Sequence, residues 1–369
     1  MAVGIGCAPS SEVALAGSER GASAMDRRTM LIGTAATVGT LMVPTVGATP
    51  VDAATRRRIR LDRTVQRWTA IEQDHHTGGP FPPGAGDGAV SFIRSPTGEM
   101  IVFQMHANGH TYRHQGSTLD DLSPGVWVDG AGFNPSPGAS HYSGISSVLR
   151  DPGSNRVHAW IHQESRGPEG HMASIGHAYS DTEGYTWEGH ETILEGDDPQ
   201  PEGFRGAESP SVARDGDRFV MLYGNRHGNG RHQQIHLATA EIDRNGSPGR
   251  WVKRGEVISE GATSPHFFAA SPSLRWSTSW RRWVCMYSTD TAYRFRTSRD
   301  LTRWSSPSTV LTKEQQWTQT DGWWRWFPTI LDDDQIDSSI MGRRGRVSEQ
   351  WLSVQDPAVR YPAWTSYRT

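Results

Sequence analysis

The sequence predicts an all-β fold, a five-bladed β-propeller, and one repeated pattern leads to this prediction. A short apolar strand with a hydroxyl residue, a polar turn and an aromatic-rich second strand occur together five times. The hydroxyl residues are Ser91, Ser147, Ser211, Ser273 and Thr329, which are 56, 64, 62 and 56 residues apart. A unit of about 60 residues holds four strands and their turns, which is one propeller blade. A β-sandwich also has short strands, but it does not predict this recurrence.

The first element is an export signal over residues 25–54. Arg27 and Arg28 precede an apolar run rich in Gly and Ala, and small residues follow near Ala48 and Ala53. A charged start, an apolar stretch and a small-residue exit are typical of a cleaved signal, here of the twin-arginine type. The apolar run is too short and too interrupted for a spanning helix, so we expect no stable membrane anchor. We interpret residues 1–24 as lying upstream of the true start at Met25.

The second element is the propeller domain, residues 55–369. A strand at residues 64–74 is expected to close the ring by supplying the outer strand of the last blade. Cys7 and Cys285 are the two cysteines, and only Cys285 survives processing, so no internal disulfide forms. A net charge of -3 argues against a nucleic-acid partner, which needs a basic surface. We expect a secreted or cell-envelope monomer.

The second half of each unit contains a tight turn that ends in a Trp. Ser180-Asp-Thr-Glu-Gly-Tyr-Thr-Trp187 and Ser298-Arg-Asp-Leu-Thr-Arg-Trp304 are the clearest copies. Ser and Asp side chains bond turn amides, and a Trp packs well between sheets, so we interpret these turns as structural. Together with Asp87-Gly88 and Glu208-Ser-Pro, these turns resemble the five-bladed propeller glycoside hydrolases, the group of invertases, levansucrases, arabinanases and β-xylosidases. The resemblance covers roughly residues 80 to 350.

Polar residues can be sorted by their place in each unit. In a propeller, the first strands begin and the second strands end on one face, around a central channel. We expect these positions to line one pocket: Asp87, His141, Glu208, His266 and Arg325 at first-strand starts, and His106, Glu164, Asn225, Arg226 and Asp290 at second-strand ends.

Glycoside hydrolysis needs two carboxyl groups, one protonated as acid and one ionised as nucleophile or base. Following the resemblance, Asp87 is placed like the family's nucleophile or base, and Glu208 like its general acid. Glu164 and Asp290 compete for a supporting role. The predicted catalytic residues are therefore Asp87, Glu208 and Glu164. The predicted substrate-binding residues are His106, His141, Arg226, His266, Asp290, Trp324 and Trp326.

The letters Arg150-Asp151-Pro152 match a motif that carries a transition-state-stabilising Asp in invertase-type enzymes. The repeat places Asp151 in the turn between a first and a second strand, away from the pocket, so we interpret it as a turn residue. No metal site and no cofactor are predicted, although the histidines leave a channel metal open. The function expected is a secreted glycosidase acting on an oligo- or polysaccharide. The alternatives are a non-catalytic carbohydrate-binding propeller and a sialidase-like hydrolase that uses Arg205, Arg226 and Arg325.

Overall fold

The computed structural model describes residues 57–67, 86–106, 111–128, 140–167, 170–196, 204–227, 232–260, 269–289, 292–312, 317–318, 323–353 and 360–369. These residues belong to one compact unit, Ala54–Thr369. The predicted start at Met25 and the predicted signal lie outside them, as do His266 and Asp290. Within the described residues, no helix has the length and apolar character that crossing a membrane requires.

The described strands divide into five antiparallel groups, numbered here in chain order. Group one contains β2 (Gly86–Arg94), β3 (Met100–His106), β4 (Thr111–Gly116) and β5 (Val126–Val128). Group two contains β6 (Ser140–Arg150), β7 (Val157–Gly167), β8 (Gly170–Ser180) and β9 (Glu188–Glu195). Group three contains β10 (Phe204–Asp215), β11 (Arg218–His227), β12 (His232–Glu241) and β13 (Val252–Ile258), and a short parallel pairing of β8 with β10 joins it to group two.

Group four contains β14 (Ala270–Ser277), β15 (Arg282–Ser288), β16 (Ala292–Ser298) and β17 (Ser308–Thr312). Group five contains β18 (Trp317–Thr318), β19 (Trp323–Leu331), β21 (Arg344–Ser353), β22 (Arg360–Arg368) and β1 (Arg60–Arg67), while β20 (Ile340–Met341) pairs with β14. β1 pairs with β22 at the outer edge of group five. The expected closing strand is therefore present; its described part is Arg60–Arg67, and residues 68–74 of the predicted strand lie outside the described residues.

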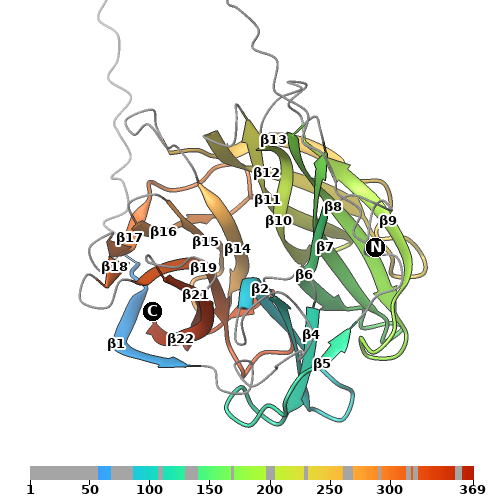
Figure 1. The fold of residues 1–369 in the computed structure, drawn as a ribbon, viewed down its shortest axis with the longest axis horizontal. Coiled ribbons are helices and arrows are strands. Elements are labelled where there is room, and N and C mark those ends of the chain that lie inside the picture. Colours follow the sequence, from blue (N-terminus) through green and yellow to red (C-terminus); the bar gives the residue numbers. More distant parts are fainter. Residues whose placement is uncertain are drawn as a thin grey trace, which may run out of the picture. The chain divides into compact units, whose positions relative to one another are not determined.

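The first strands of the groups form a ring. β2 contacts β6, β6 contacts β10, β10 contacts β14, β14 contacts β19, and β19 contacts β2. Figure 1 shows these strands around the middle of the unit, with β5, β9, β13 and β17 farther out. The predicted all-β propeller is thus confirmed, with strand starts and ends gathered around one axis.

The repeated hydroxyl residues join each first strand to the next. The backbone amides of Val148, Val212, Leu274 and Ile330 donate hydrogen bonds of 2.9 to 3.0 Å to hydroxyls of the preceding group. Their acceptors are Ser91, Ser147, Ser211 and Ser273, in that order. The side chains of Ser91 and Ser338 are 2.6 Å apart, which links group one to the turn of group five. The hydroxyl recurs in the sequence because each buried amide at a group boundary needs an acceptor.

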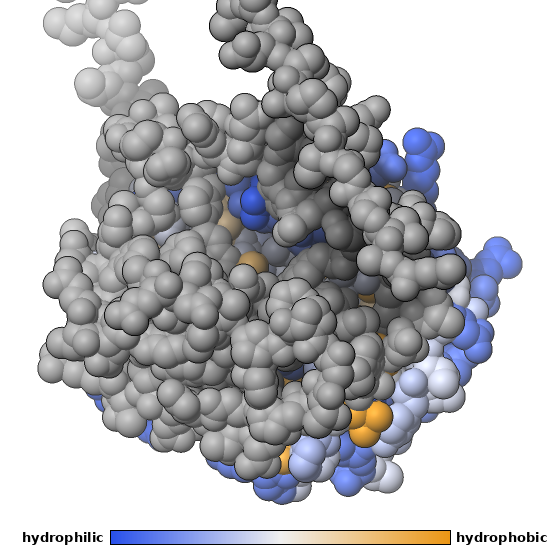
Figure 2. Space-filling view, in the orientation of Figure 1, coloured by the Kyte–Doolittle hydropathy of each residue, from blue (hydrophilic) through white to orange (hydrophobic). Residues whose placement is uncertain are grey.

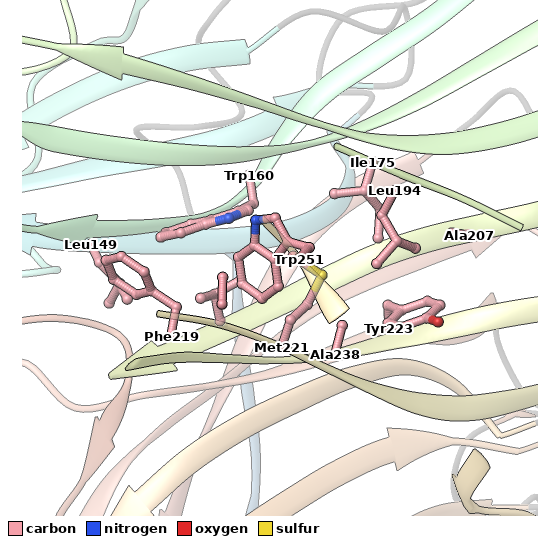
Figure 3. Close-up of a cluster of buried hydrophobic side chains, with 12 residues drawn as sticks. Leu149, Trp160, Ile175, Leu194, Ala207, Phe219, Met221, Tyr223, Ala238 and Trp251 are labelled. Atoms are coloured by element: carbon pink, nitrogen blue, oxygen red, sulfur yellow. The ribbon is translucent and has the colours of Figure 1, made fainter. Parts of the chain in front are cut away.

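Hydrophobic clusters fill the spaces between successive groups. Figure 3 shows the cluster between groups two and three, where Trp160 of β7 packs against Trp251 and Phe219. Comparable clusters join group one to two, three to four, four to five, and five to one. In Figure 2 the described surface is mostly hydrophilic, with isolated hydrophobic spots, which agrees with a buried core.

The Trp-containing turns are structural, as predicted. The Ser298 hydroxyl accepts from the amides of Asp300 and Leu301, and the Trp304 indole donates to the Leu301 carbonyl at 2.8 Å. Asp151 lies in the turn between β6 and β7, where its carboxylate accepts from the amide of Ser154. The sequence interpretation of Asp151 as a turn residue is confirmed.

Two stacked histidines in group two predict a pH-dependent stability. The rings of His158 and His177 are buried, with His158 Nδ1 3.1 Å from His177 Nε2. Burial lowers the pKa of His158 to about 4. Burial, with the charges of His158 and His190, lowers the pKa of His177 to about 3. Because an unfolded His titrates near pH 6.5, the unfolded chain binds more protons below that pH, and stability falls as pH falls.

We expect each of the two histidines to cost about 1 kcal/mol of unfolding free energy between pH 7.5 and 5.5. Urea unfolding at both pH values measures this loss. The double variant His158→Phe/His177→Phe removes both titrations and should lose about 2 to 3 kcal/mol less over that range. An equal loss in the variant and the parent would contradict the assignment.

Candidate active site

A buried carboxylate lies within β10 (Phe204–Asp215), at a position that the repeat predicts to face the pocket. Glu208 is only 2% exposed. Its Oε2 lies 2.8 Å from Nε of Arg226, and its Oε1 accepts a hydrogen bond from the side-chain amide of Gln233. A buried charge is costly unless it is paired and hydrogen-bonded, and here both oxygens have a donor. Arg226 of β11 and Gln233 of β12 therefore hold the Glu208 side chain in place from the two neighbouring strands.

The backbone at Glu208 is bent by a strained residue. Ser209 has φ of +50°, and the register of β10 against β11 shifts between Glu208 and Ser211. A residue before proline strongly prefers an extended backbone, so positive φ at this position costs about 1 to 3 kcal/mol. The same deviation occurs at Ser271 and Phe327, each directly before a proline in a first strand. The bulge turns the side chains of these strand starts out of their regular alternation.

A histidine and a second glutamate complete the cluster. His162 and Glu164 are two residues apart on β7, so their side chains lie on the same face. His162 Nδ1 accepts from the Ser209 amide at 3.0 Å, and its Nε2 lies 2.9 Å from Oε1 of Glu164. One side-chain atom each of His162, Glu164 and Glu208 lies within 4.8 Å of the other two. Trp160, on the same face of β7, packs in the core between groups two and three.

Two opposing effects set the charge of His162. Burial lowers its pKa, but the hydrogen bond that its ring donates to Glu164 and the charges of Glu164 and Glu208 outweigh burial and raise the pKa. The Ser209 amide points at Nδ1, which opposes a proton on that nitrogen. The neutral ring therefore holds its proton on Nε2, toward Glu164.

These three side chains are also ligand types that bind metal ions. The guanidinium of Arg226 already supplies a positive charge beside Glu208, which opposes a cation at the same carboxylate. The donor set therefore fits an acid–base cluster better than a metal centre.

A glycine makes room for the Gln233 contact. Gly224 of β11 lies directly opposite Glu208 of β10 and Ile235 of β12. A Cβ at Gly224 would lie 2.0 Å from Nε2 of Gln233 and 3.2 Å from Cγ of Glu208. Gln233 thus reaches Glu208 by crossing the space that a side chain at Gly224 would fill.

Replacing Gly224 with Ala is expected to displace the Gln233 side chain and to lower stability by about 1 to 3 kcal/mol, the usual cost of overpacking. Urea unfolding measures the loss. The variant Gln233→Ala removes the group that is displaced, so Gly224→Ala/Gln233→Ala should be less destabilised than the sum of the single variants. If the double variant instead lost as much stability as the two single variants together, Gln233 would not be the side chain that Gly224 accommodates.

The structure brings three of the predicted site residues together: Glu208, Glu164 and Arg226. Asp87, His106, His141, Arg325, Trp324 and Trp326 lie in strands, at the predicted first-strand starts or second-strand ends, but their side chains are outside the described residues. The pairing of Asp87 with Glu208 therefore stays a prediction. Sequence reasoning missed His162, Gln233 and Gly224. The spacing His162-x-Glu164 in a strand is the one signal that pointed to the first of them.

Comparison with solved structures identifies similar folds at low sequence identity. An N-acetylgalactosamine deacetylase from F. plautii, in complex with blood group B trisaccharide, matches 84% of this chain and 95% of its own, with 10% identity and a TM-score of 0.56. An α-L-arabinofuranosidase from Podospora anserina, in complex with cellotriose, matches 84% and 98%, with 10% identity and a TM-score of 0.54. An α-L-arabinofuranosidase from Lactobacillus brevis matches 74% and 88%, with 12% identity and a TM-score of 0.50.

No protein-family model and no curated protein sequence matches the chain. The solved structures therefore establish the fold, and at this level the expected resemblance to propeller glycoside hydrolases is confirmed. Fold alone does not fix chemistry, so the function has to be argued from the site.

Proposed function

We propose that this chain is a carbohydrate-active hydrolase that cleaves a glycosidic bond, with Glu208 as a catalytic carboxylate. The observation that carries the proposal is a buried carboxylate, paired with Arg226 and followed directly by the strained residue Ser209, on a first strand of a propeller. Strain and buried charge both cost stability, and proteins retain such costs mainly at functional sites. Carbohydrate ligands in the similar structures support the choice of substrate class.

The environment of Glu208 favours one of the two carboxylate roles. The sequence placed Glu208 as general acid, which must carry a proton before the bond breaks. Here Arg226 forms an ion pair with one oxygen and Gln233 donates a hydrogen bond to the other, contacts that suit a carboxylate acting without a proton of its own to give. We therefore assign Glu208 as nucleophile or base. Asp87, at the start of β2, is then the candidate for the acid.

Glu164 has a supporting role in this proposal. Its nearest carboxylate oxygen is within 4.8 Å of that of Glu208. Carboxyl groups that face each other across a glycosidic bond are about 5 to 9.5 Å apart. We place Glu164 beside Glu208, on the same side of the site, and not as the opposite catalytic group. It holds His162, which in turn holds the Ser209 amide next to Glu208.

A screen tests the proposed function. The purified protein is incubated with aryl glycosides of arabinofuranose, galactose and xylose, and with plant and bacterial polysaccharides. Hydrolysis that is lost in Glu208→Gln is the expected result. Glycan binding without hydrolysis, equal in the parent and the variant, would favour the non-catalytic alternative.

We also propose export by the twin-arginine route, on the basis of residues 25–54. The variant Arg27→Lys/Arg28→Lys should leave the protein in the cytoplasm of an expressing cell, whereas the parent reaches the envelope or medium. Cell fractionation measures the difference. A buried free thiol at Cys285 and the lack of any disulfide within the described residues agree with folding before export.

A further inference from the structure

Three arginines lie side by side on neighbouring strands of group five. They are at the strand ends that face away from the predicted pocket, where Glu208 is expected to lie. Arg368, near the end of β22, is the direct partner of Arg60 at the start of β1 and of Arg344 at the start of β21. Directly paired residues place their side chains on the same face of a sheet. All three side chains are exposed. They form a row, called here the arginine row, that crosses three strands.

Like charges in direct register are unfavourable, because each raises the energy of its neighbour. In the part of the chain that the structure describes, no carboxylate pairs with any of the three. Arg346, on the same face, differs because both its terminal nitrogens bind Asp120 at 2.6 to 2.7 Å. The row thus concentrates positive charge that the described residues do not neutralise.

A pocket lies at the row. It has a volume of about 620 Å³, and the three arginines line it together with Ser366 and Tyr367. Tyr367 is 3% exposed, and its hydroxyl has no hydrogen-bond partner among the described residues. The pocket therefore combines guanidinium forks with the Ser366 hydroxyl on one face of β22, whereas the Tyr367 side chain packs in the core on the other face.

We propose that the arginine row binds an anionic polysaccharide through carboxylate or sulfate groups on successive sugar units. Guanidinium forks bind such groups bidentately. Neighbouring strands are about 4.8 Å apart, so three arginines present charge over about 10 Å. This spacing of the three guanidinium groups suits charges spaced along a linear glycan better than one compact anion. The site lies at the far ends of the strands from Glu208, and it is independent of the reaction proposed there.

Binding of defined polymers to the full chain tests the proposal. The probes are oligogalacturonate for carboxylates, dextran sulfate for sulfates, neutral dextran, and phosphatidylglycerol vesicles. At low salt we expect the first, the second or both to bind, and neutral dextran not to bind. The variant Arg60→Gln/Arg344→Gln/Arg368→Gln should weaken binding about tenfold or more, and added salt should weaken it in the parent.

The matched control is Arg244→Gln/Arg250→Gln/Arg303→Gln, which removes the same charge from exposed arginines elsewhere. It should bind like the parent. Equal weakening in the two triple variants would overturn the proposal, because binding would then follow net charge alone. Binding to the vesicles but to neither charged glycan would also overturn it. The single variant Arg344→Gln gives an independent measurement if the triple variant unfolds.

Discussion

Glu208→Gln is expected to lower kcat/KM for glycoside hydrolysis by roughly 10²- to 10⁴-fold, the usual contribution of one catalytic carboxylate. The amide keeps the shape of the side chain and a contact to Arg226 or Gln233, so the fold should be preserved. It cannot act as nucleophile or base. Steady-state kinetics on the best substrate from the screen measure the effect, with circular dichroism as the test of folding.

Two further measurements distinguish the role of Glu208. If Glu208 is the acid, Glu208→Ala should retain activity on a dinitrophenyl glycoside, whose leaving group needs no proton. As the nucleophile or base that we propose, it should lose activity on that substrate too. Added azide should then restore turnover in Glu208→Ala by taking the place of the missing group. Full activity on the dinitrophenyl glycoside would return Glu208 to the acid's role.

The controls for this prediction come from the same region. Glu195→Gln changes an exposed glutamate of β9 and should leave the kinetics unchanged. Glu164→Gln should have an intermediate effect and a changed pH profile, because it removes the partner that raises the pKa of His162. An unchanged profile in Glu164→Gln would contradict the positioning role of the Glu164–His162 pair.

The repeat could be read from the sequence because a propeller uses the same contacts at each boundary. Ser91, Ser147, Ser211 and Ser273 recur since each accepts one buried amide from the next group. Because first strands begin and second strands end on the same face of a propeller, the repeat then predicted that Glu208, Glu164 and Arg226 lie close together on that face. This part of the site follows from periodicity alone.

The contacts around Glu208 could not be read in the same way. Gln233 reaches Glu208 only because Gly224, on the strand between them, has no side chain. His162 was overlooked because its partner is the amide of Ser209, a backbone group that every residue type supplies. The role that we propose for Glu208 differs from the one predicted from the repeat for a related reason: the repeat predicts its place in β10, but its contacts come from Arg226 of β11 and Gln233 of β12.

Ser211→Ala is expected to be the most destabilising of the small changes at the group boundaries. The Ser211 hydroxyl accepts from the Leu274 amide at 2.9 Å and from Nη1 of Arg275 at 3.2 Å. Arg275 is 3% exposed, and its Nε also donates to the Ile330 carbonyl of group five. One hydroxyl thus connects groups three and four, and the arginine that it binds extends the connection to group five.

Alanine removes the acceptor of the Leu274 amide and of one N–H of Arg275 Nη1, which keeps only its hydrogen bond to the Leu274 carbonyl. An unsatisfied buried donor costs about 1 to 3 kcal/mol, and a charged one costs more, so we expect a loss of about 3 kcal/mol in unfolding free energy. Urea unfolding measures the loss. Native-state hydrogen exchange should show faster exchange at the Leu274 amide, because its hydrogen bond is gone.

Two variants show whether the acceptor itself is responsible. Ser211→Thr keeps the hydroxyl and should retain most of the stability, as Thr329 occupies the equivalent position in group five. Ser306→Ala removes an exposed hydroxyl and should change stability by less than about 0.5 kcal/mol. If Ser211→Ala and Ser306→Ala were equally stable, the repeated serine hydroxyls would not hold the groups together. The hydrophobic clusters between the groups would then have to supply the stability of the ring.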